Sequence, residues 1–171
     1  PTGALLPDGR SLILARDRAA NIAAMNALGA GDGDAYGSAM RFVEQNAALI
    51  FALLGNELWS GKVARTLLGR LWKRGARDTV GFFGPALQSS RAWLETHIRS
   101  DLTRALLAPW VLHTGLGPES ALSALMMQVI AFTLEAVGLP LVKGGNARTV
   151  DAFRAVVEKA GGRFETQADV A

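Results

Sequence analysis

The sequence predicts a mainly α-helical protein with a small β component, an α+β fold. Half of the 171 residues are apolar, which is enough for a sizeable core. Apolar residues recur at helical spacing through most of the chain, and Gly, Pro, Asp or Ser residues separate the segments. Strand-like patterns are confined to the two ends. The sequence therefore predicts about seven helices, one β-hairpin and one further strand.

The first predicted element is a β-hairpin within residues 4–17. Leu5-Leu6 and Ser11–Leu14 are short apolar runs, and the residues between them, Pro7-Asp8-Gly9-Arg10, are typical of a turn. Asp17 is then the expected N-cap of a helix that ends near Leu28.

Six further helices follow from apolar periodicity and capping residues. We expect them over about residues 32–54, 61–74, 85–97, 101–107, 118–137 and 147–160. Residues 163–167 are predicted to form a strand after the glycine pair Gly161-Gly162. A single strand leaves both of its edges unpaired, so we expect its partner strands to belong to another domain.

The most apolar predicted helix lies within residues 121–139. These 19 residues approach the length that crosses a bilayer. The segment also contains four polar residues, Ser123, Gln128, Thr133 and Glu135. We therefore expect a helix buried in protein, and a cytoplasmic chain or one attached peripherally to a membrane.

Composition excludes several kinds of site. The chain has no cysteine and only two histidines, so disulfides, thiol catalysis and a histidine-built metal site are not expected. It contains no nucleophile elbow, P-loop or zinc-protease motif, and no catalytic residue stands out. The net charge of +3 and the few aromatic residues do not indicate nucleic-acid binding.

Two histidines and one glycine-rich segment are candidate sites. Gly29–Asp34 resembles half of a dinucleotide fingerprint, but a predicted helix precedes it where the mechanism needs a strand. A helix-to-helix turn with aspartate N-caps is the preferred interpretation. His97 is expected to sit at a helix C-terminus. His113 fits a core or helix-end position, and a place lining a substrate cavity is the alternative.

Residues 58–77 form a basic amphipathic stretch. No acid lies between Glu57 and Asp78. The cations are Lys62, Arg65, Arg70, Lys73, Arg74 and Arg77, and the apolar residues expected on the opposite face are Val63, Leu67, Leu68, Leu71 and Trp72. A surface helix with a solvated basic face fits this pattern, and so does a helix that docks on an anionic membrane surface.

A glycine pair near the C-terminus has a clearer mechanism. Gly144 and Gly145 permit a positive φ and let the backbone approach a flat ligand closely. Asn146 or Thr149 is expected to cap the next helix. That helix is predicted to bury one stripe, formed by Val150, Phe153, Val156 and Val157. An ordinary loop before a helix remains an equal alternative on local evidence.

Four segments, taken in order, resemble FAD-dependent oxidoreductases of the phytoene desaturase and amine oxidase type. They are Pro7–Arg10, Ser89–Trp93, Ala108–Pro118 and Pro140–Val170. The resemblance implies that residues 1–139 form a helix-rich substrate domain with an N-terminal hairpin. Residues 140–171 would be the return segment of a discontinuous FAD-binding domain.

The same resemblance implies site residues. Gly144 and Gly145 would lie near the flavin and Val170 near the adenine, while Asn146, Arg148 and His113 would lie near an apolar or amine substrate. The N-terminal pyrophosphate fingerprint of the family is missing, so we expect this chain alone to bind FAD weakly or not at all, and to be inactive.

Three further expectations complete the interpretation. The chain reads as the central piece of a longer protein, and surfaces left uncovered would allow it to form homo-oligomers. The alternative function is a standalone helical module for membrane-surface or protein binding, built on the basic helix 61–77.

Overall fold

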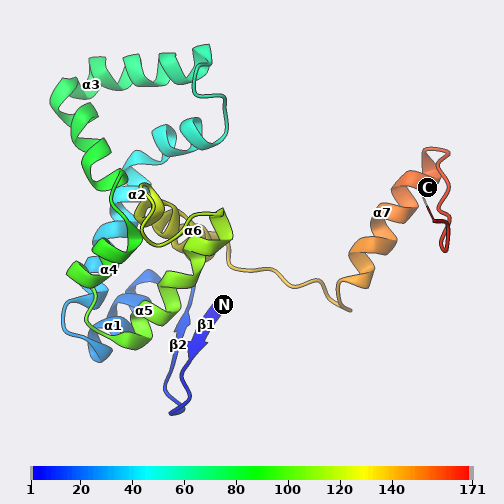
Figure 1. Ribbon diagram of the computed structural model, residues 1–171, viewed down its shortest axis with the longest axis horizontal. Helices are drawn as coiled ribbons and strands as arrows, with labels where there is room; N and C mark the ends of the chain where they lie inside the picture. Colours follow the sequence, from blue (N-terminus) through cyan, green and yellow to red (C-terminus); the bar gives the residue numbers. More distant parts are fainter. Residues whose placement is uncertain (1, 170–171) are drawn as a thin grey trace. The chain divides into compact units, whose positions relative to one another are not determined.

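Residues 2–169 are described in the computed structural model of the chain, and they form seven α-helices, one 3₁₀-helix and one two-stranded sheet. The prediction of a mainly helical protein with a small β component is confirmed. The chain divides into two compact units, one up to Gly138 and one from Leu139 onward. Figure 1 labels the elements of the two units.

The predicted β-hairpin is present in the first unit. Strands β1 (Thr2–Leu5) and β2 (Ser11–Leu14) pair in an antiparallel ladder. The Asp8 carboxylate accepts a hydrogen bond from the Arg10 backbone N–H at 3.0 Å, which closes the turn. Leu12 and Leu14 face the core, and the alternate residues of β2 are exposed.

Helix α1 (Arg18–Leu28) begins where the capping pattern predicts. The Asp17 carboxylate accepts hydrogen bonds from the backbone N–H groups of Ala19 and Ala20, which no intrahelical carbonyl can satisfy. Asp17 is therefore the N-cap, as predicted.

The glycine-rich segment after α1 is a tight helix-to-helix turn. It leads into α2 (Asp32–Leu54), and α1 packs along α2. A Cβ atom at Gly33 would overlap the carbonyl group of Ile22, so glycine allows the close approach of the two helices. The expected aspartate N-cap of α2 is wrong. Gly31 holds that position, and the Asp32 carboxylate accepts from the N–H groups of Arg99 and Ser100 instead.

Helix α3 (Gly61–Ala86) is bent. Gly75 has a left-handed φ of 82° and divides α3 into two helical halves, so the predicted end near Arg74 coincides with this break. Figure 1 shows the two halves meeting at a sharp angle. The second half continues through Ala86 and was not predicted from the sequence.

The predicted helix over 85–97 is confirmed at its end, His97, but its predicted start at Pro85 is wrong. Pro85 lies inside the last turn of α3, and α4 (Ser90–His97) starts separately. The Ser89 hydroxyl accepts from the Ala92 N–H and so caps α4.

Helix α5 (Asp101–Leu107) is confirmed and leads directly into the 3₁₀-helix η1 (Ala108–Thr114). Helix α6 (Ser123–Val137) begins five residues later than the predicted start at Pro118. The residue before α6, Leu122, has a left-handed φ of 68°, which is incompatible with a helix that runs through it.

Helix α6 lies at the centre of the first unit. It packs against α2, α4, η1 and α3, and nine of its fifteen residues are buried. The expectation of a buried apolar helix is thus confirmed. No helix within residues 2–169 combines the length and the apolar character that spanning a membrane requires.

The second unit contains α7 (Ala147–Lys159), and no residue of α7 is buried. The stripe predicted to be buried is exposed by 38–69%, so that prediction is wrong for this chain. Between Leu139 and residue 169 the unit consists of one helix and short flanking segments, which is too little material to form a core. The side chain of Asn146 makes no capping hydrogen bond.

The strand predicted at 163–167 is not formed in the described residues. Strand geometry is held by a ladder of hydrogen bonds to a neighbour, and the two-stranded sheet of residues 2–14 uses only its own strands. Within this segment, Phe164 contacts α7 through its side chain: the Arg154 guanidinium lies 5.9 Å from the centroid of its ring. Val170 lies outside the described residues.

Candidate functional site

A cavity of the first unit is formed by four helices. It has a volume of about 890 Å³, within the usual range of small-molecule pockets. The start of α2, the end of α3, the link to α4, α4 itself and α6 all contribute. Its lining residues are Asp34, Ala35, Ser38, Ala39, Gly84, Pro85, Leu87, Gln88, Trp93, His97 and Gln128.

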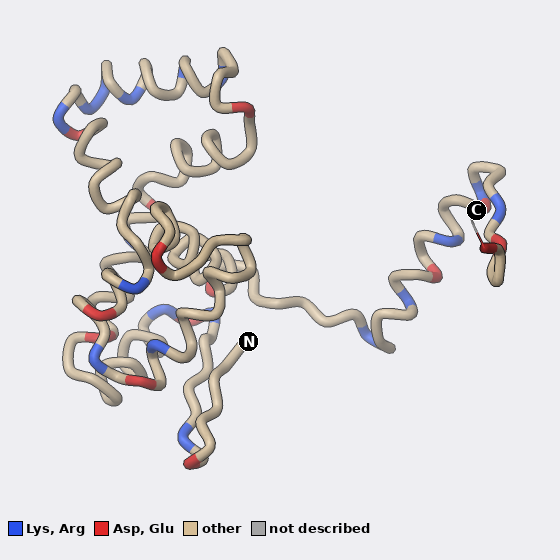
Figure 2. Tube along the Cα trace, viewed as in Figure 1, with Lys and Arg blue, Asp and Glu red and all other residues tan. Residues whose placement is uncertain are grey.

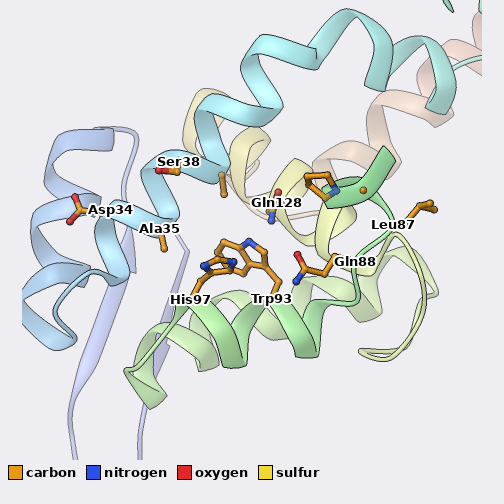
Figure 3. A pocket seen from close by; sticks show the side chains of 11 residues that line it. Asp34, Ala35, Ser38, Leu87, Gln88, Trp93, His97 and Gln128 are labelled. Atoms are coloured by element: carbon orange, nitrogen blue, oxygen red, sulfur yellow. The ribbon is translucent and has the colours of Figure 1, made fainter. Parts of the chain in front are cut away.

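An aromatic pair from α4 forms one wall of the cavity. The ring centroids of Trp93 and His97 are 5.3 Å apart, because residues four apart lie on the same helix face. Trp93 is 8% exposed, whereas His97 is exposed at the helix end. Figure 3 shows the two rings side by side at the centre of the site.

Two glutamine amides flank this aromatic wall. Gln128 comes from α6 and is 7% exposed, and Gln88 comes from the link between α3 and α4. Figure 3 shows both side chains close to the Trp93 ring, with Asp34 farther out. Neither amide makes a side-chain hydrogen bond to another residue within 2–169, so both remain able to bind polar groups of a ligand.

This arrangement suits binding and orientation of a ligand with a flat or apolar body. An indole ring offers a large apolar face, and amides can fix a polar end. Groups of three or more metal-ligating side chains do not occur among the described residues.

A buried ionic network lies in the same unit and joins α1, α2 and α6. Glu135 is 4% exposed and accepts from the Tyr36 hydroxyl at 2.6 Å, from Arg18 Nε at 2.6 Å and from Asn21 Nδ2 at 3.3 Å. Burial, and secondly the hydrogen bond to Glu135, raises the pKa of Tyr36 well above its ordinary value. Hydrogen bonds to Glu44 and then to Glu135 raise the pKa of Arg18. Because each partner is satisfied, the network is best understood as structural.

Four of the residues singled out from the sequence lie together in the second unit. Gly144 and Gly145 have φ values of 88° and 87°, so the left-handed backbone expected of the pair is present. Arg148, in the first turn of α7, folds back so that its Nε lies 3.4 Å from where a Cβ of Gly144 would be. A Cβ at Gly145 would meet no atom within 4 Å, so its backbone is open on that side. Asn146 completes the cluster immediately before α7.

His113 lies in the first unit at the end of η1. It is exposed, and its ring packs against the ring of Trp110 at a centroid distance of 6.3 Å. It is not among the residues that line the 890 Å³ cavity. His113 therefore lies at a helix end and not in the core or at the cavity.

Sequence reasoning missed most of the cavity. Gln128 was the residue with a usable signal, since it is a polar residue among the apolar side chains of α6. Ser38 and Gln88 carry no such pattern.

A comparison of this chain with protein-family models, with curated protein sequences and with solved structures found no match.

Proposed function

We propose that this chain is the substrate-binding part and return segment of an FAD-dependent oxidoreductase that acts on an apolar or amine substrate. The observation that carries the proposal is the second unit. A left-handed glycine pair leads into a helix whose whole apolar stripe is exposed. Such a stripe is stabilised once another protein surface covers it, and the proposal supplies that surface as a nucleotide-binding domain.

The cavity in the first unit supports the substrate half of the proposal. Its Trp93 wall suits an apolar body, and Gln88 and Gln128 can orient a polar end. The proposed role of the first unit is to hold the substrate. The flavin would supply the redox chemistry, and the protein contributes binding and orientation.

The residues present fit FAD only in part. The open backbone at Gly145, next to Arg148, leaves room for a flat ring system. The glycine-rich turn at Gly29–Gly33 is occupied by the packing of α1 against α2 and offers no phosphate site. The pyrophosphate would therefore be held by protein outside residues 2–169, and the isolated chain should retain no stoichiometric flavin.

Flavin absorbance tests this proposal in two samples. The isolated chain is mixed with FAD and gel-filtered, and the protein peak is expected to carry no flavin bands. The longer product of the same reading frame is expected to carry flavin, and Gly145→Val within it should lower flavin retention. Gly9→Val, at a hairpin-turn glycine with the same left-handed backbone, is the matched control and should leave retention unchanged. A flavin-free longer product would refute the proposal.

A separate experiment tests the cavity. The probe N-phenyl-naphthylamine is added to the chain, and energy transfer from Trp93 to the bound probe is recorded in a variant whose other three tryptophans are phenylalanine. In this single-tryptophan background, Ser38→Phe is expected to narrow the cavity and weaken probe binding, whereas Ala24→Phe, on an exposed position of α1, should not. Equal probe binding by both variants would show that the cavity is not the binding site.

A further inference from the structure

The first half of α3 presents an apolar surface to solvent. Leu68, Leu71 and Trp72 are 65%, 42% and 92% exposed, and their spacing places them on one helix face. Leu58 and Trp59, just before the helix, are 64% and 100% exposed. We call the set Leu58, Trp59, Leu68, Leu71 and Trp72 the outer face.

The same half-helix has a separate inward side. Val63 is 2% exposed, and Leu67 packs partly buried against the core cluster of α2, α3 and α6. The sequence predicted a single apolar face for this helix, opposite its cations. The structure divides them, because Val63 and Leu67 already supply the contact with the protein. The outer face is therefore not needed for the packing of this unit.

The six cations of the segment divide in the same way. Arg70 points inward: its side chain is 10% exposed, and it pairs with Asp78 at 2.6 Å and with Asn46 Oδ1 at 2.6 Å. Its guanidinium also lies 5.4 Å from the ring centroid of Phe82. Arg74 donates to the backbone carbonyl of Gln45 at 3.4 Å.

Four cations remain without such partners. Lys62, Arg65, Lys73 and Arg77 are exposed and form no side-chain hydrogen bond or ion pair within residues 2–169. Figure 2 shows this part of the chain in blue and tan, with red only at its two limits, Glu57 and Asp78. A helix with 100° per residue places Arg65 about 20° around the axis from Trp72, beside the outer face, whereas Lys62 and Lys73 lie about 80–100° from Trp72, on the flank between the outer face and the inward side.

We propose that the outer face of α3 docks on the surface of a lipid bilayer that contains anionic lipid. The exposed tryptophans and leucines enter the boundary between headgroups and acyl chains. Arg65 beside this face meets the anionic headgroups, and the long side chains of Lys62 and Lys73 extend to them from the flank. Tryptophan favours this boundary because its ring is apolar and its N–H is polar. An acidic protein would match the cations, but a lipid surface also matches the two nearly fully exposed indole rings. The proposal does not rest on the proposed flavin chemistry.

Vesicle co-sedimentation of the full chain is the primary test. The chain is expected to sediment with vesicles of phosphatidylcholine and phosphatidylserine, much less with phosphatidylcholine alone, and less as salt increases. Each free cation should contribute about fivefold to the partition coefficient, so Lys62→Glu with Lys73→Glu should reduce it at least about 25-fold. Arg99→Glu with Lys143→Glu makes the same change in net charge at other exposed sites and should have a much smaller effect.

Tryptophan fluorescence provides an independent readout. Trp59→Phe and Trp72→Phe together should abolish the blue shift that vesicles induce, because Trp93 and Trp110 lie outside the outer face. Trp110→Phe should preserve the shift. Circular dichroism checks that each variant keeps the fold. We expect the fold to be kept, because Trp59 and Trp72 are exposed and contribute little to packing.

Two outcomes would overturn the proposal. One is equal sedimentation of the wild type and of Trp59→Ala with Trp72→Ala on anionic vesicles, since the apolar contact would then contribute nothing. The other outcome combines two results: the chain does not bind vesicles, and sedimentation velocity shows a dimer that the Trp72→Ala substitution dissociates. That result would assign the outer face to a second copy of this chain.

Discussion

Helices α6 and α7 differ in where their apolar side chains lie. In α6 nine residues are buried, among them the ionic partner Glu135, and four other elements cover the helix. In α7 the apolar stripe is just as regular, yet none of its residues is buried. The comparison teaches that helical periodicity identifies the face that is apolar. Burial additionally requires a surface to cover that face, and residues 139–169 do not supply one.

The largest expected effect comes from removing a core side chain of the first unit. Leu102 is fully buried between the hairpin and the helices, so Leu102→Ala should lower the free energy of unfolding by about 2–5 kcal/mol. Urea denaturation followed by circular dichroism measures the change. Leu141→Ala, at a residue that is 90% exposed in the second unit, is the control and should change stability by less than about 0.5 kcal/mol. Equal losses would contradict the contrast between the units.

A smaller loss is expected at Asp32. Its buried carboxylate accepts the backbone N–H groups of Arg99 and Ser100 at 2.8 and 2.9 Å. Asp32→Ala leaves these donors without partners and should cost about 1–3 kcal/mol in the free energy of unfolding. Asp34→Ala changes an exposed carboxylate two residues away and should have little effect. Thermal unfolding compares the two variants. An unchanged melting temperature for Asp32→Ala would show that the hydrogen bonds of Asp32 do not stabilise the fold.

Alkaline pH should weaken the first unit through Tyr36. The folded pKa of Tyr36 is raised above that of the unfolded chain by burial and by Glu135, so the folded state favours the neutral phenol. This contribution to stability is fully present below about pH 10, the ordinary tyrosine value, and is lost as pH rises above it. Tyr36 is the single tyrosine of the chain, so tyrosinate absorbance reports on it directly.

The matched variant for this pH effect is Tyr36→Phe. It should show a shallower loss of stability between neutral and alkaline pH than the wild type, since lysine titration is common to both. Superimposable pH profiles would mean that Tyr36 titrates normally in the folded protein.

The smallest effect is expected on α7. Phe153 is 69% exposed, so Phe153→Ser should change the unfolding free energy by less than about 0.5 kcal/mol. The same substitution in a longer product that covers α7 should be clearly destabilising. Urea denaturation of the variant in both contexts checks this, and a large loss in the isolated chain would mean that α7 is already packed.

Local signals predicted the local elements of this fold. The turn at Pro7–Arg10, the cap at Asp17 and the break near Arg74 depend on neighbouring residues alone, and each is present in the structure. The second half of α3 was missed because a proline such as Pro85 favours the first turn of a helix, yet here it lies in the last turn of α3, where Phe82 and Ala86 pack in the core.

The start of α6 was misplaced because Pro118-Glu119 is a good helix start that the left-handed Leu122 overrides.

The candidate cavity was largely beyond sequence reasoning. Its walls come from segments as far apart as Asp34 and Gln128, and only tertiary packing brings them together. The glycine pair at Gly144 and Gly145 was predictable, because a positive φ at adjacent glycines is a local property. The expected position of Val170 at an adenine stays a prediction.

Amide hydrogen exchange of the full chain tests most directly whether α6 and α7 differ in being covered. The account predicts that amides of α6 exchange very slowly, because they become accessible only when the whole unit unfolds. Amides of α7 should exchange at close to the rate of an unfolded chain. A thirteen-residue helix without buried side chains has little stability of its own. Protection of α7 equal to that of α6 would contradict the account, because the stripe of Val150, Phe153, Val156 and Val157 would then already be covered.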